Sequence, residues 1–389
     1  MPARHLPTAA PDGLLAALLL SFLATAGLFY VNIMPALVAG LVDGLHYTAR
    51  QAGLVGSANV YGAACGALVA VFLVRRVPWR PAAVAVLIAL IFADLASTFV
   101  RAPEAMIAMR FVHGSIGGLL VGIGFAVIAR THNPDRVFGM LLVVQFGLGG
   151  VGLMTLPRLV PVFGVKALFL ALALFSLVTL LMVPFLADYP VRKAETTGGA
   201  RATRIAWRPL GLALLSVFLF QGGNMALAAY MIELGRAYGL QTGFISTTLG
   251  IAAWIGAIGS ILVVVLGTRF GRLKPLAIAL VLTVLGNAAF HFSGSAVIFA
   301  AANVGTAITW AFVIPYLLGM CAAFDATGQT AAMGGFASKM GLATGPLVAA
   351  TLLHGTNYSL LIDLAVAALI GSAIAALLPA RVLDSGQPL

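Results

Sequence analysis

About twelve apolar stretches, each roughly twenty residues long, follow one another from Leu14 to Pro379 with short polar turns between them. A helix needs about 20 residues to cross the hydrocarbon core of a bilayer, so each stretch is long enough to span it. Only 8% of the residues are charged, whereas a soluble domain carries about 25%. The chain is therefore predicted to be an all-α polytopic membrane protein with about 12 transmembrane helices.

The polar turns set the bounds of the predicted spans. These cover residues 14–40, 52–74, 81–100, 104–129, 137–157, 166–187, 209–233, 244–267, 275–292, 296–320, 331–353 and 359–379. The longest polar stretch, residues 188–208, is rich in basic and small residues and is predicted to be a flexible cytoplasmic linker. It separates an N-terminal six-helix bundle, residues 1–187, from a C-terminal one, residues 209–389.

Basic residues gather in alternate loops. The net charge of +11 would indicate nucleic acid in a soluble protein, but here its placement indicates topology. One set of loops holds Arg4, Arg75, Arg76, Arg80, Arg130, Arg136, Arg192, Lys193, Arg201, Arg204, Arg208, Arg269, Arg272, Lys274 and Arg381. Because cytoplasmic loops collect Lys and Arg, both termini are predicted to be cytoplasmic, in a bacterial-type inner membrane. The lipid bilayer is thus the expected partner of this charge, not nucleic acid.

The two halves look like copies of one unit. The segment from Gly152 to Pro157 returns as the segment from Gly341 to Pro346, with Gly, Leu, Thr and Pro at one constant offset. Parallel six-span repeats are typical of transporters whose substrate site lies near the bilayer midplane, between the halves. The repeat therefore predicts two pseudo-symmetric bundles around a central site.

Short motifs in loops and spans resemble those of the major facilitator superfamily. The segment Arg269-Phe270-Gly271-Arg272 resembles its loop motif, with Thr268 where the family has an acid. The equivalent turn after the second span keeps only the arginines of the motif, Arg75, Arg76 and Arg80. In the family this loop locks one conformation through charge pairs. Without the acid, a weaker lock is expected, or one that uses helix carbonyls.

Two further motifs lie within spans. Residues 110–118 resemble the R-x-x-Q-G-x-G motif of proton-coupled members, with His113 in place of Gln, and residues 163–169 match the usual opening of span 6. A glycine-rich segment resembles the antiporter motif. Its glycines and prolines, with their repeats, are Gly149, Gly150, Gly152, Pro157, Gly341 and Pro346. They serve either close helix packing or a conformational bend.

Charged residues inside the membrane are functional candidates because they are costly to bury there. Arg110 lies about seven residues from the outer end of its span and Asp94 about thirteen from the inner end of the preceding one; at about 1.5 Å per residue the two depths coincide. An Asp94–Arg110 pair is predicted, either for proton coupling or as a permanent salt bridge. His113, one turn from Arg110, is expected to be neutral and to serve as a coupling group, a substrate contact or a packed polar residue.

Lys339 lies about eight residues into its span, roughly 12 Å deep, with no acid at the same depth in a neighbouring span. It is predicted to face a central cavity, where a cation suits an anionic substrate, although hydrogen bonds to carbonyl groups are the alternative. The other predicted cavity residues are amides and aromatics. They are Tyr30, Asn32, Asn59, Gln145, Gln221, Asn224, Trp254, Asn303, Trp310 and Tyr316. Glu233 and Arg236 are predicted to form a solvated pair at the outer rim.

The leading prediction is a secondary transporter of a small organic molecule, which exports its substrate by proton antiport. Proton-coupled uptake of a small organic anion is the alternative, and a polytopic membrane enzyme is a remote one. No nucleotide-binding motif occurs, so the proton gradient is the expected energy source and no cofactor or metal is expected. A monomer is expected.

Overall fold

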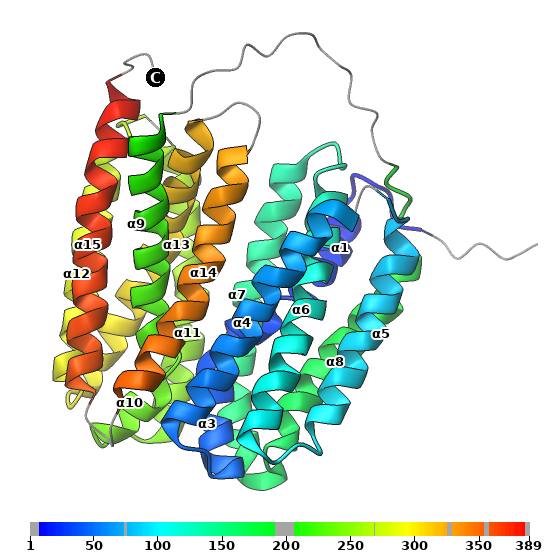
Figure 1. Cartoon of the computed structure of the whole chain (residues 1–389), viewed down its shortest axis with the longest axis horizontal. Coiled ribbons are helices and arrows are strands. Elements are labelled where there is room, and N and C mark those ends of the chain that lie inside the picture. The colour runs from blue at the N-terminus through cyan, green and yellow to red at the C-terminus, as the bar shows by residue number, and fades with distance from the viewer. Residues whose placement is uncertain are drawn as a thin grey trace, which may run out of the picture.

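The computed structural model describes residues 8–73, 76–190, 206–267, 269–324, 329–353 and 358–385. Within these ranges the chain forms helices and no named strand. Two helical bundles stand side by side, one from each half of the sequence (Figure 1). Arg75, Thr268, His354 and most of the predicted linker lie outside the described residues.

In the part of the chain that the structure describes, the N-terminal bundle contains nine helical segments. They are α1 (Leu14–Ala26), α2 (Phe29–Asn32), α3 (Met34–Leu45), α4 (Ala49–Leu73), α5 (Trp79–Ser97), α6 (Pro103–Ile128), α7 (Pro134–Phe163), α8 (Lys166–Met182) and η1 (Val183–Phe185). The C-terminal bundle contains the remaining eight. They are α9 (Trp207–Ala228), α10 (Met231–Ala237), α11 (Thr242–Leu266), α12 (Leu273–Ala288), η2 (Ala289–Phe292), α13 (Ala296–Ala323), α14 (Gln329–Leu352) and α15 (Ser359–Asp384).

Ten of the described helices are long and apolar enough to cross a membrane. The discontinuous run α1–α3 and the glycine-rich α14 supply the other two predicted spans. The predicted fold class, with about twelve spans in two six-span bundles, is therefore confirmed.

The first span is broken, not continuous over residues 14–40 as predicted. The helix stops at Gly27, where an added Cβ would lie 2.2 Å from the carbonyl oxygen of Gly117 in α6. Only glycine allows the two backbones to approach so closely at the break. Pro35 stands at the start of α3, where its missing N–H costs no helical hydrogen bond. The seventh span divides in the same way, into α9 and α10.

The fifth span is longer than predicted. Pro157 does not end it, because α7 contains both Pro157 and Pro161 and continues to Phe163. Prolines are tolerated inside membrane helices because groups of neighbouring helices satisfy the backbone carbonyls that lose their hydrogen bonds. The helix ends instead at Gly164, whose φ of +71° is a conformation that favours glycine.

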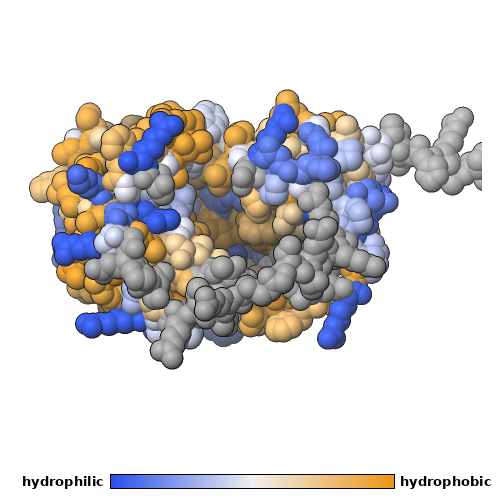
Figure 2. All heavy atoms as spheres, turned by 90° about the horizontal axis from the view of Figure 1, so that it is seen from above, coloured by the Kyte–Doolittle hydropathy of each residue, from blue (hydrophilic) through white to orange (hydrophobic). Residues whose placement is uncertain are grey.

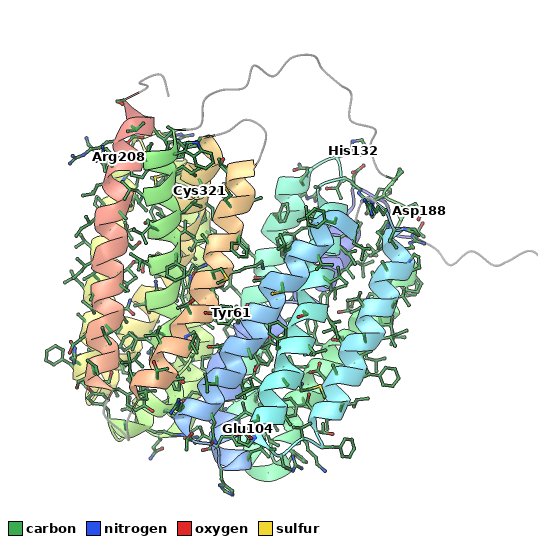
Figure 3. The ribbon with its side chains drawn as sticks, viewed as in Figure 1. Tyr61, Glu104, His132, Asp188, Arg208 and Cys321 are labelled. Carbon is green, nitrogen blue, oxygen red and sulfur yellow. The ribbon has the colours of Figure 1, made fainter. Side chains whose placement is uncertain are left out.

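The bundles meet at one end of the molecule and separate at the other. Helices α3 and α10, α4 and α14, and α7 and α11 pack against each other across the two halves. We call the end where α3 meets α10 the closed end; Glu104 lies there (Figure 3). The opposite face, which includes Arg208, His132 and Asp188, is hollowed between the halves (Figure 2). We call it the open end.

Candidate functional site

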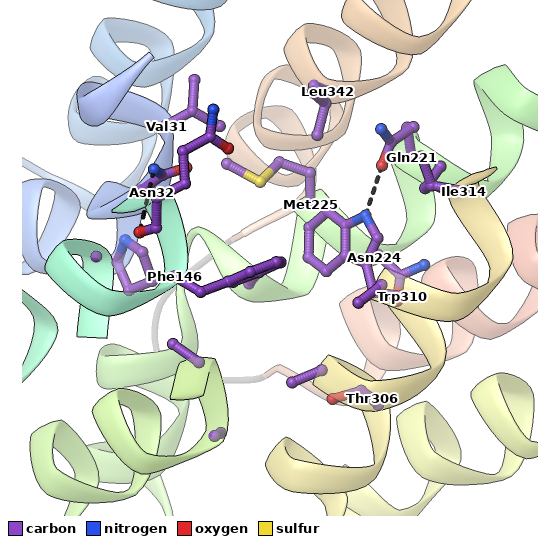
Figure 4. Close-up of a pocket in the computed structure, with 18 of the residues that line it drawn as sticks. Val31, Asn32, Phe146, Gln221, Asn224, Met225, Thr306, Trp310, Ile314 and Leu342 are labelled. Atoms are coloured by element: carbon purple, nitrogen blue, oxygen red, sulfur yellow. Dashed lines mark hydrogen bonds between the residues drawn. The ribbon is translucent and has the colours of Figure 1, made fainter. Parts of the chain in front are cut away.

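A central cavity of about 410 Å³ lies between the two bundles. Most of its wall is apolar, and its polar side chains come from both halves (Figure 4). These polar residues include Asn32, Gln145, Gln221, Asn224, Asn287, Asn303, Trp310 and Lys339. All except Asn287 were predicted to line the cavity. Asn287, on α12, lines the cavity without having been predicted to.

Hydrogen bonds fix the polar groups on the C-terminal side of the cavity. The Trp310 indole N–H donates to Gln221 Oε1 at 2.7 Å (Figure 4). Gln221 Nε2 in turn donates to the hydroxyl of Ser338 at 2.8 Å. Asn287 Nδ2 donates to Asn224 Oδ1 at 3.3 Å. These bonds hold an aromatic ring and several amides in a set arrangement, which suits recognition of a small organic molecule.

Among the residues that the structure describes, Lys339 is the one cation in the cavity wall, and no acid lines the cavity with it. Its side chain is half-buried, and none of the ion pairs among the described residues includes it. An ammonium group in a largely apolar wall attracts an anion more strongly than it would in water, because the surroundings screen it less. Lys339 thus lines the central cavity, at the position predicted from the sequence.

The predicted Asp94–Arg110 pair is present inside the N-terminal bundle. Arg110 Nη1 donates to Asp94 Oδ1 at 2.9 Å, and both residues are fully buried. His113 Nε2 lies 3.2 Å from the same oxygen. We call Asp94, Arg110 and His113 the buried triad. It lies behind the cavity wall, because none of its members lines the cavity.

Hydrogen bonding defines the tautomer of the His113 imidazole. Asn59 Nδ2 donates to the Arg110 carbonyl at 3.1 Å, so this atom is the amide nitrogen, and it also lies 2.8 Å from His113 Nδ1. Nδ1 therefore accepts, and the ring proton is on Nε2, where it donates to Asp94. The histidine is neutral in this arrangement, as expected, but its partner is an acid of its own bundle.

Four predicted cavity residues lie elsewhere. Tyr30 and Asn59 contact the buried triad: the Arg110 guanidinium carbon lies 5.8 Å from the centre of the Tyr30 ring. The Trp254 indole N–H donates at 3.0 Å to the Gly147 carbonyl, across the two halves. The Tyr316 hydroxyl donates to a backbone carbonyl within the C-terminal bundle. These four side chains hold helices in place and do not line the cavity.

The glycine-rich segment brings α7 and α11 into direct contact. An added Cβ on Gly150 would lie 2.9 Å from the Gly250 carbonyl oxygen, and one on Gly250 would lie 2.7 Å from the Gly150 carbonyl oxygen. Crowding is similar elsewhere in the predicted set. Added Cβ atoms on Gly149, Gly152 and Gly341 would lie 3.2, 2.6 and 2.4 Å from atoms of neighbouring helices, and Pro346 is inside α14. At these positions the glycines allow neighbouring helices to approach closely.

Acids from distant helix ends anchor the arginine loops. Both oxygens of Asp384, at the end of α15, accept from the backbone N–H of Arg272, at 2.8 and 2.9 Å. Gly271, with a φ of +71°, brings that backbone against the carboxylate. In the N-terminal bundle, Arg80 lies 3.5 Å from Asp188, which follows the sixth span. Asp384 therefore supplies the loop with an acid that its own sequence lacks.

The predicted rim pair between Glu233 and Arg236 is wrong. Arg236 instead donates two hydrogen bonds of 2.8 Å to Asp43, across the closed end. Glu233 is only 8% exposed, and neither of its carboxyl oxygens has a hydrogen-bond partner among the described residues. The break before α10 turns this carboxyl inward, away from solvent.

Comparison with known proteins agrees with this architecture. The model of the Major Facilitator Superfamily matches residues 15–323. Among solved structures, the nucleoside transporter NupG has a TM-score of 0.72 at 14% identity, covering 94% of this chain and 99% of its own. A D-xylose-proton symporter has a TM-score of 0.67 at 13% identity, covering 95% and 97%. No curated protein matches the sequence.

Proposed function

Because the chain belongs to the major facilitator superfamily, and is thus a multi-pass membrane transporter and not an enzyme, we propose that it carries a small organic anion through its central cavity. The observation that supports this proposal is Lys339, a cation without an acidic partner among the described residues. A carboxylate accepts hydrogen bonds from an ammonium group and from amide N–H groups, both of which this wall offers. Trp310 adds a ring against which a flat apolar part of the substrate can pack.

Proton coupling is the second part of the proposal. Asp94 has one oxygen bound to Arg110 and a second without a partner among the described residues. Protonation of Asp94 would weaken its attraction to the guanidinium and so change the packing between α5 and α6. The D-xylose-proton symporter, which has the same fold, is by its name a precedent for proton coupling.

Direction and location complete the proposal. Arg208, which belongs to one of the basic loops, lies at the open end (Figure 3), so the cavity of this conformation would face the cytoplasm of a bacterial-type inner membrane. We propose that the substrate enters there and is exported by antiport with protons. Uptake by symport is the competing direction.

Transport in sealed vesicles tests the substrate class. Labelled carboxylates would be compared with neutral nucleosides and sugars, in wild-type protein and in Lys339→Ala. A hydrogen bond to a charged group contributes about 1.5–3 kcal/mol, so the KM for anions should rise about 10- to 150-fold, and that for neutral compounds far less. Lys166→Ala, which removes an exposed lysine at the start of α8, is the matched control.

The same assay has outcomes against the proposal. Equal losses for anions and neutral compounds, with unchanged melting temperature, would give Lys339 a conformational role. Better transport of cations by Lys339→Ala would refute the anion assignment. Repeating the assay in both vesicle orientations, with and without a protonophore, distinguishes export from uptake and tests proton coupling.

A further inference from the structure

Glu233 has an unusual environment for an acid. It lies on α10 at the closed end, is only 8% exposed, and both carboxyl oxygens lack a hydrogen-bond partner among the described residues. An ionised carboxylate in such a place would have lost its water without gaining a donor. The neutral acid is therefore the form that fits this conformation.

The charged groups around Glu233 are already engaged. Arg236, three residues further along α10, donates from Nη1 and Nη2 to Asp43 of α3 and from Nε to the Thr242 hydroxyl. The other titratable groups acting on this carboxyl are Tyr230 and Tyr358, which supply no positive charge. The Tyr230 hydroxyl donates a hydrogen bond of 3.0 Å to the Ala49 carbonyl, in the other half of the molecule. While the closed end is shut, no described cation forms an ion pair with Glu233.

Opening of that end would change the partners. When α10 leaves α3, Arg236 loses Asp43, and water reaches the carboxyl of Glu233. Residues three apart on a helix lie on one face, so the freed guanidinium of Arg236 can then pair with Glu233. The acid O–H gives its proton to water, and the resulting carboxylate accepts hydrogen bonds from Arg236.

We propose that Glu233 is a proton-binding site, separate from the buried triad, that is loaded when the closed end is shut and emptied when it opens. Arg236 alternates between Asp43 in the shut state and Glu233 in the open state. The inference depends on the alternating access of the proposed function, but not on the substrate or on coupling through Asp94.

Distances between spin labels across the closed end test this site. Ala102→Cys and Gln241→Cys place labels at exposed positions in opposite halves, in a background with Cys65→Ser and Cys321→Ala. In the otherwise unchanged chain, the ratio of shut to open states should fall as pH rises, by at most tenfold per pH unit for a single proton. With Glu233→Gln, which keeps the shape but cannot ionise, the shut state should persist at every pH.

Three further variants make the result decisive. Glu104→Gln removes an exposed acid at the same end and should respond to pH like the wild type. Glu233→Asp keeps a carboxyl and should retain the response, which provides a test should Glu233→Gln fail to fold. Asp94→Asn separates this site from coupling through the buried triad.

The outcomes distinguish the two proposals. A pH response that survives in Glu233→Gln, or is missing from the wild type, would overturn the assignment of Glu233. A response that disappears in Asp94→Asn but survives in Glu233→Gln would assign the proton to the triad alone. A response lost in Glu233→Gln but kept in Asp94→Asn would establish this site even if coupling through the triad fails.

Discussion

Gly250→Ala should push the two halves apart at the crossing of α7 and α11. The added Cβ would lie 2.3 Å from Met154 Cγ and 2.7 Å from the Gly150 carbonyl oxygen. The methionine can rotate away, but the carbonyl belongs to the backbone of α7, so relief requires separation of the helices. Overpacking of this kind costs about 1–3 kcal/mol. The ratio of shut to open states should therefore fall about 5- to 150-fold, because every 1.4 kcal/mol is a factor of ten.

The label pair across the closed end measures this ratio. Gly147→Ala is a matched control on α7, because its added Cβ has no atom within 4 Å and its carbonyl can still accept from Trp254. Alanine also favours the helix more than glycine does, but this gain applies in the shut and open states alike and does not change their ratio. An unchanged distance distribution in Gly250→Ala, with a normal melting temperature, would refute the argument that this crossing restrains the halves.

Three other perturbations have defined outcomes. Asp94→Asn leaves Arg110 buried without its counter-charge, so it should lower the free energy of unfolding by about 3–5 kcal/mol in thermal or denaturant unfolding; an unchanged stability would show that the pair is not a structural requirement. Asp384→Ala removes the acceptor at the start of α12 and should destabilise the C-terminal bundle by about 1 kcal/mol, whereas Asp384→Asn, which keeps an acceptor oxygen, should cost less; equal effects would show that the carboxylate charge, and not the acceptor oxygen alone, provides the stabilisation. Reporter fusions should read cytoplasmic after Arg80 and external near Gln241, and one reversed site would refute the topology.

Contacts between consecutive helices were the most predictable part of the site. Asp94 and Arg110 are on consecutive antiparallel helices, so counting residues from the helix ends was enough to place them at one depth. The faces of the helices were harder to predict. Asn59 and Tyr30 are on cavity-lining spans but turn toward the buried triad, because rotation about a helix axis depends on the packing of both faces and not on depth.

Long-range partners could not be inferred from local patterns. Arg236 follows Glu233 by one helical turn, which suggested a pair, but the bond that forms joins it to Asp43 in the other half. Likewise, the acid absent from position 268 is replaced by Asp384, more than a hundred residues later. Such contacts depend on how the two halves and the helix ends pack against each other, and the local pattern of a single sequence carries no information on that packing.

The lone charge of Lys339 has an electrical consequence. In a carrier that alternates, this ammonium group gains access to water first from one side of the membrane and then from the other, so part of a unit charge crosses the membrane field. A full unit charge moved through 100 mV corresponds to about 2.3 kcal/mol. The equilibrium between the inward-facing and outward-facing states of the unloaded carrier then depends on voltage. A bound monoanion cancels the charge, so the same equilibrium of the loaded carrier hardly depends on voltage. A voltage that is negative inside draws the empty carrier toward its inward-facing state, so the resting potential of a cell would itself return an exporter to the side where it collects its cargo.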